Sequence, residues 1–154
     1  MTKSIRKEFW EAFEKSPFVM VKLEEGNAHA LPMTAQLDKD ADSEFWFYTT
    51  HDNRLAEGGR AMAQFVSKGH DLYACIAGTL VAETDPAVID RYWSKQAEAW
   101  YEGGRNDPNL LMLRFDLDDA EIWTSDLGLT GLFKLMTGKT IDPQEAGRHA
   151  DIKL

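Results

Sequence analysis

The residues best suited to hold a charged ligand follow a short apolar stretch in the first third of the chain. Residues 44–48 read Glu-Phe-Trp-Phe-Tyr, and the polar residues that come next include Thr49, Thr50, Asn53 and Arg54. Bulky apolar residues are typical of a strand, so these polar groups are expected at its C-terminal end. An arginine offers a planar fork of donors and hydroxyls add short hydrogen bonds, which together suit a phosphate. An ordinary core strand with a polar turn explains the segment equally well.

Other side chains that could do chemistry are scattered. Cys75 is the only cysteine and lies in an apolar stretch, which favours a small buried residue over a nucleophile. The four histidines lack the grouped spacing of zinc ligands, so no metal site is predicted. Gly138-Lys139-Thr140 is similar to the end of a nucleotide-binding P-loop, but the preceding Gly131 stands at the wrong spacing. No residue is identified as catalytic.

The segment 44–57 resembles the phosphate-binding strand and turn of the pyridoxamine 5'-phosphate oxidase-like flavoproteins. Ala30-Leu31-Pro32-Met33 stands where the bacterial general stress protein branch of that family has Arg-Pro-Met. Residues 93–108 resemble the branch's tryptophan-rich helix and Gly/Asp-Pro loop, and residues 110–123 its last barrel strands. The resemblance spans roughly residues 5–125. It implies a mainly β protein with flanking helices, a six-stranded antiparallel FMN-binding split barrel.

At the phosphate end, the resemblance assigns FMN contacts to the turn after residue 48. Thr49, Thr50, Asn53 and Arg54 would bind the phosphate, and Leu55 stands where many family members have a lysine. The missing cation weakens a point charge but leaves bidentate recognition by arginine possible. We expect FMN to bind more tightly than FAD, because a site that closes on a terminal phosphate leaves no evident room for an adenylate.

At the ring end, the resemblance places the flavin between two strands. Pro32 and Met33 are the candidates for the apolar wall, and backbone groups of Thr34, Phe47 and Tyr48 would face the polar edge of the ring. Plain core packing is the alternative for Met33.

The resemblance also implies a homodimer, because Trp123 matches a tryptophan that approaches the flavin from the partner subunit. A residue of the barrel core is a nearly equal alternative for Trp123. Trp93, Trp100 and Tyr101 fit an amphipathic helix over the barrel mouth, and they could also form a lid or a dimer contact.

Composition limits the class of protein. The chain has 154 residues, 44% of them hydrophobic and 28% charged, and a formal net charge of -9. This composition describes one folded domain, residues 1–154, and its acidity disfavours nucleic acid as a partner. No apolar run reaches the ~18 residues of a membrane span, and no signal-peptide core follows Met1, so a cytoplasmic location is expected.

Periodicity and turn signals outline the elements. A helix is predicted over residues 4–15, with Ser4 as its cap, and a second helix over 84–101. A C-terminal helix and tail are expected over 127–154, with the helix at 127–137. The predicted strands, which indicate an antiparallel barrel, cover residues 18–23, 28–37, 45–50, 61–67, 72–83, 110–116 and 121–125.

Two functions follow from the resemblance. The first is a flavin-dependent oxidoreductase that acts on an unidentified small substrate. The alternative is a non-catalytic, flavin-sequestering stress protein. Oxidation of pyridoxamine phosphate is not expected, since residues 138–154 lack the Arg-x-His-x-Arg-like substrate motif of the oxidases.

Overall fold

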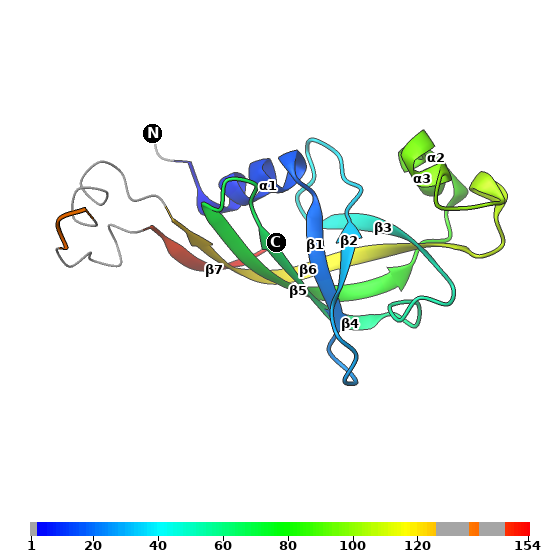
Figure 1. Ribbon diagram of the computed structural model, residues 1–154, viewed down its shortest axis with the longest axis horizontal. Helices are drawn as coiled ribbons and strands as arrows, with labels where there is room; N and C mark the ends of the chain where they lie inside the picture. The colour runs from blue at the N-terminus through cyan, green and yellow to red at the C-terminus, as the bar shows by residue number, and fades with distance from the viewer. Residues whose placement is uncertain (1–2, 126–135, 139–146) are drawn as a thin grey trace.

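The computed structural model describes residues 3–125, 136–138 and 147–154 (Figure 1). The predicted helix over 127–137 lies, except for its last two residues, outside the described residues. In chain order the described elements are α1 (Ile5–Lys15), β1 (Phe18–Leu23), β2 (Leu31–Thr34), β3 (Glu44–Thr50), β4 (Gly59–Val66), β5 (Leu72–Ala82), α2 (Pro86–Tyr92), α3 (Lys95–Glu98), the 3-10 helix η1 (Gly104–Asn106), β6 (Leu110–Thr124) and β7 (His149–Lys153).

Six of the strands wrap into a barrel. Their order is β2-β1-β4-β5-β6-β3, and every pairing between them is antiparallel. A single bridge between Gln36 and Trp46 joins the chain after β2 to β3 and closes the sheet. Each residue of this bridge donates its backbone N–H to the other's carbonyl, at 2.7 and 2.9 Å. The expected six-stranded antiparallel split barrel is therefore confirmed, and β7 is added outside it on β6.

An aromatic cluster joins the N-terminal helix to the barrel core. Ser4 caps α1 as predicted, since its hydroxyl accepts the backbone N–H of Lys7. Phe9 and Phe13 are fully buried, and the ring of Phe13 contacts those of Phe45 and Phe65 at 4.8 and 5.1 Å between centroids. The aromatic residues spaced along α1 therefore fix it against β3 and β4.

One long strand replaces two predicted ones. The acidic segment Leu117–Ala120 suggested a turn, but β6 runs through it as one continuous strand (Figure 1). Leu117 and Ala120 are buried, whereas the two aspartates between them are exposed. The register with β5 shifts between Ala77 and Gly78. A Cβ on Gly78 would lie 2.4 Å from the carbonyl oxygen of Asp116, so glycine permits this close approach.

The helix predicted over 84–101 is also divided. Asp85 caps α2 as expected, with Pro86 at its first position. The helix then ends at Tyr92, and Ser94 takes an extended conformation and caps the separate helix α3. None of the described helices has the length and apolar character needed to cross a lipid bilayer.

Strand β7 was not expected from the sequence, which suggested a polar surface tail. Its residues alternate between exposed and half-buried, and it pairs antiparallel with β6 from Asp119 to Trp123. Arg148, just before β7, forms an ion pair with Glu8 of α1. These contacts attach the end of the chain to both the sheet and the first helix.

Candidate functional site

A cavity of about 670 Å³ opens between β2, β3 and the segment that contains α3. Its volume lies within the range of small-molecule sites, roughly 300–1,000 Å³. Segments far apart in the sequence meet there. The lining residues are Phe18, Leu31, Pro32, Met33, Thr34, Gln36, Tyr48, Thr49, Thr50, Asn53, Ser94, Gln96, Ala97, Trp100 and Tyr101.

Seven of the eleven predicted site residues line this cavity. They are Pro32, Met33, Thr34, Tyr48, Thr49, Thr50 and Asn53. The first three come from β2 and the next three from β3, which are the strands joined by the closing bridge of the barrel. The structure therefore brings the predicted ring wall and the predicted phosphate turn to one cavity.

Arg54 lies beside the cavity rather than in its lining. Its side chain is exposed, and its Nη1 donates a hydrogen bond of 2.7 Å to the carbonyl oxygen of His29. The preceding residue, Asn53, accepts the N–H of Leu55 with its Oδ1. Its amide NH₂ is the part of the side chain that can donate to a ligand. The expected preference for FMN over FAD was based on a lack of room for the adenylate beside the phosphate. Because the Arg54 side chain is exposed, the structure does not support that steric reason.

The hydroxyl of Thr50 is engaged by an acidic neighbour. It donates to Oδ1 of Asp52 at 2.5 Å, and this hydrogen bond lowers the pKa of the Asp52 carboxyl below its usual range. Asp52 is exposed and carries a negative charge at neutral pH. A phosphate in the turn would compete with Asp52 for the Thr50 hydroxyl.

Two predicted residues turn their side chains into the core. Phe47 and Leu55 are fully buried, and the ring of Phe47 packs 5.5 Å from that of Phe45. Only backbone groups of these two residues could reach a ligand. For Phe47 this agrees with the expectation, which assigned its backbone and not its ring.

The wall opposite β2 was identified only in part. Trp100 and Tyr101 stood out in the sequence as a possible lid, whereas Ser94, Gln96 and Ala97 were not identified, and neither was Phe18 of β1, beside β2. The break at Ser94 lets α3 turn its residues toward the cavity. The Ser94 side chain accepts the N–H of Ala97, which is an N-cap pattern that the sequence does display.

Two tyrosines tie this wall to the barrel. The hydroxyl of Tyr48 donates to the carbonyl of Ile89 at 2.5 Å, and that of Tyr101 donates to the carbonyl of Thr49 at 3.0 Å. The ring of Trp93 packs between them, 5.5 Å from Tyr48 and 5.8 Å from Tyr101. Burial raises the pKa of both tyrosines to about 12, so both phenols stay protonated at neutral pH.

Trp123, the last predicted residue, lies elsewhere on the sheet. It is 41% exposed, and its ring stacks on the imidazole of His149 at 5.1 Å. It lines a second cavity of about 510 Å³, together with residues of β4, β5 and β7 that include Met62, Cys75 and Asp151. A single chain therefore does not bring Trp123 to the first cavity.

The outer face of the sheet carries several exposed large apolar side chains. Its exposed large side chains are Phe18, Met20, Met62, Val66, Tyr73 and Trp123. Register places Val66 opposite Tyr73 and Tyr73 opposite Trp123, so these side chains form a row across β4, β5 and β6. Phe18 also lines the first cavity, so this face extends to the cavity rim. Contiguous exposed apolar surface is typical of interaction sites.

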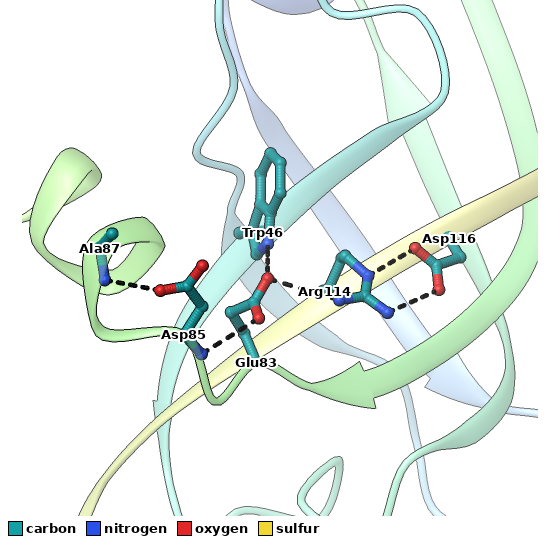
Figure 2. A network of polar contacts seen from close by, with 6 residues as sticks. All are labelled: Trp46, Glu83, Asp85, Ala87, Arg114 and Asp116. Carbon is teal, nitrogen blue, oxygen red and sulfur yellow. Dashed lines mark hydrogen bonds and ion pairs between the residues drawn. The ribbon is translucent and has the colours of Figure 1, made fainter.

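A polar network supports the start of α2 (Figure 2). Figure 2 shows Glu83 between Trp46 and Arg114: it accepts the indole N–H of Trp46 at 3.0 Å and pairs with Arg114 at 3.4 Å. Its other oxygen accepts the N–H of Asp85 at 3.4 Å. Burial raises the pKa of Glu83, but these hydrogen bonds and the charge of Arg114 outweigh it and hold the pKa below the usual range.

The network should make stability depend on pH. Since the folded pKa of Glu83 is lowered, its contribution is present at neutral pH and is lost as pH falls through that lowered pKa. Glu83→Ala should cost about 1–3 kcal/mol of unfolding free energy at pH 7, because it leaves the Trp46 donor unpaired. Glu83→Gln, which keeps an acceptor for Trp46, should cost less. Denaturant unfolding, repeated at decreasing pH from pH 7, measures both. A Glu83→Ala deficit that stays constant down to the lowest pH at which the protein is folded would contradict the assignment.

Comparison with protein families identifies the chain as similar to a known family. The pattern of the family described as pyridoxamine 5'-phosphate oxidase like matches residues 4–144. Among curated proteins, none matches the chain.

Solved structures of similar proteins agree with the fold. A general stress FMN/FAD binding protein from Xanthomonas citri is 45% identical, with 83% of this chain and 94% of that chain covered and a TM-score of 0.75. A general stress family protein from Xanthomonas campestris pv. campestris is 43% identical, with 84% and 94% covered and a TM-score of 0.75. A general stress protein 26 from Jannaschia sp. CCS1 is 30% identical, with 96% of each chain covered and a TM-score of 0.77.

Proposed function

This chain belongs to the pyridoxamine 5'-phosphate oxidase-like family, and on that basis we propose that it binds FMN in the cavity between β2, β3 and α3. The observation that carries the proposal is the meeting of residues 32–34 with residues 48–50 and Asn53 at this one cavity. The Xanthomonas citri relative, which is described as binding FMN/FAD, supports a flavin as the ligand. When bound, the flavin supplies the redox chemistry, and the chain supplies binding and orientation.

The phosphate would lie at the turn that follows β3. Arg54 would have to turn from the His29 carbonyl toward the cavity, which it does not line, whereas Asn53 already lines the cavity. An arginine holds a phosphate through charge-assisted hydrogen bonds. The ring would lie against Pro32 and Met33, where β2 presents apolar side chains to the cavity.

The second half of the proposal is a homodimer formed through the apolar outer face of the sheet. Burying Tyr73, Trp123 and their neighbours against a second copy removes exposed apolar surface from water. Because Phe18 belongs both to this face and to the cavity lining, a partner on this face would border the cavity. That arrangement would let the partner's copy of Trp123 approach the flavin.

We further propose that the protein is a flavin-dependent oxidoreductase that works on a small molecule in a reducing cytoplasm, where Cys75 stays a thiol. One observation favours the alternative, a protein that only sequesters flavin. The phenols of Tyr48 and Tyr101 are both engaged, so neither is free to act as a general acid. Turnover of bound flavin with NAD(P)H as reductant separates the two.

Titration of the apo-protein with flavins tests the cofactor assignment. FMN should bind at least about 10-fold more tightly than riboflavin, since a charge-assisted hydrogen bond contributes roughly 1.5–3 kcal/mol. Flavin absorbance after equilibrium dialysis gives both affinities directly. FAD is a third arm that reports whether the open phosphate end accepts an adenylate. Equal affinities for FMN and riboflavin would remove the phosphate site from the proposal.

A further inference from the structure

The cavity lining carries no formal charge. Among the described residues that line it, the side chains are aromatic, aliphatic, hydroxyl or amide, and none belongs to Asp, Glu, Lys, Arg or His. Its only titratable groups among these are the phenols of Tyr48 and Tyr101, which are protonated at neutral pH. The chain as a whole carries a formal charge of -9. Nothing in the described lining therefore offsets the charge of an anion.

The same cavity exposes large aromatic surface. Trp100 is 84% exposed and Phe18 is 60% exposed, although both line the cavity. The backbone that carries Trp100 is held in place, because its N–H donates to the carbonyl of Ala97 and the next residue, Tyr101, is fixed to Thr49. An indole that is positioned by its backbone but left open to solvent provides a flat face for a second ring.

We propose that this cavity, beside the flavin, binds an uncharged planar ring molecule such as a quinone, stacked against Trp100. The inference rests on the proposed function and specifies its substrate class. Stacking of a neutral ring needs an aromatic face and no opposite charge. This lining offers aromatic faces and has no charged side chain among its described residues.

A phosphorylated substrate fits the lining poorly. The proposed FMN phosphate uses Arg54, which stands outside the lining, and the described lining holds no cation for a second phosphate. A buried or half-buried anion without a partner is costly. The engagement of both phenols is compatible with this class, because a quinone that would take two electrons from the reduced flavin can take its two protons from water.

Binding of two matched probes to the FMN-loaded protein tests the inference. Menadione is a neutral naphthoquinone, and 1,4-naphthoquinone-2-sulfonate has the same ring system with one negative charge. Equilibrium dialysis and the shift of the flavin absorption bands measure their affinities. Menadione should bind at least about 10-fold more tightly. Trp100→Ala should weaken menadione binding by about 10-fold, whereas Trp100→Phe should retain most of it because a ring remains.

Lys95→Ala is the matched control, since Lys95 lies in α3 but does not line the cavity. It should leave menadione binding unchanged. Equal binding of the two probes, or a Trp100→Ala variant that binds menadione as the wild type does, would overturn the inference. FMN affinity is measured separately for every variant. If FMN does not bind at all, the proposed function fails, and the same probes titrated into the apo-protein still decide between a neutral and an anionic ligand.

Discussion

Replacing Arg54 by Ala is expected to weaken FMN binding by about 1.5–3 kcal/mol, or roughly 10- to 150-fold. The variant removes the guanidinium beside the cavity and leaves the buried core untouched, because the Arg54 side chain is exposed. Riboflavin, which has no phosphate, should bind the variant and the wild type alike. The comparison of the two flavins therefore isolates the phosphate contact.

Arg6 provides the control for this experiment. It too is an exposed arginine that donates to a backbone carbonyl, that of Asp42 at 2.7 Å, and it does not line the cavity. Arg6→Ala should leave FMN affinity unchanged. Arg54→Lys should recover only part of the loss, since a lysine supplies charge without the planar fork. Wild-type FMN affinity in Arg54→Ala would place the phosphate elsewhere.

Replacing Tyr73 by Glu is expected to dissociate the proposed homodimer. Tyr73 lies in the middle of the exposed apolar row, between Val66 and Trp123, and it is 40% exposed in the single chain. A carboxylate there would be buried without a partner in the dimer, and the two-fold axis would add a second one. Sedimentation should change from twice the 17.4 kDa chain mass to the single chain.

FMN links this result to the cavity. If the partner completes the site, FMN must stabilise the dimer, and Tyr73→Glu should lower FMN affinity together with dimerisation. Lys39→Glu is the control, because Lys39 is exposed in the connection between β2 and β3 and lies outside the apolar row. This variant adds negative charge but should lower neither FMN affinity nor dimerisation. A single chain that still binds FMN with full affinity would end the shared-site proposal and leave Trp123 as a surface residue.

Local patterns predicted most of the barrel. β1 has the predicted bounds, and α1 begins at its predicted cap, because alternation and capping are properties of neighbouring residues. β6 was wrongly divided at Asp118 and Asp119, which read as a turn. In the structure both are exposed, and Asp118 pairs with Arg60, so a strand tolerates them at that point.

The failures share a physical cause, which is dependence on distant partners. β7 is too polar and too short to be identified alone, and it exists through its pairing with β6. The cavity residues of β2 and β3 could be identified by resemblance, whereas Phe18 and Gln96 could not. Their contribution depends on how the barrel closes and where α3 turns, which no short pattern reports.

The burial of Leu55 has a consequence for any attempt to engineer tighter cofactor retention. The resemblance suggests restoring a lysine at this position, but Leu55 is fully enclosed by the core. A lysine there would replace packed apolar atoms by a desolvated ammonium. Burial would then either lower the pKa of that lysine until it is neutral or destabilise the fold. The exposed neighbour Asp52, which holds the Thr50 hydroxyl, is the better position to alter. In this chain, charge at the proposed phosphate turn is best changed at solvent-exposed positions.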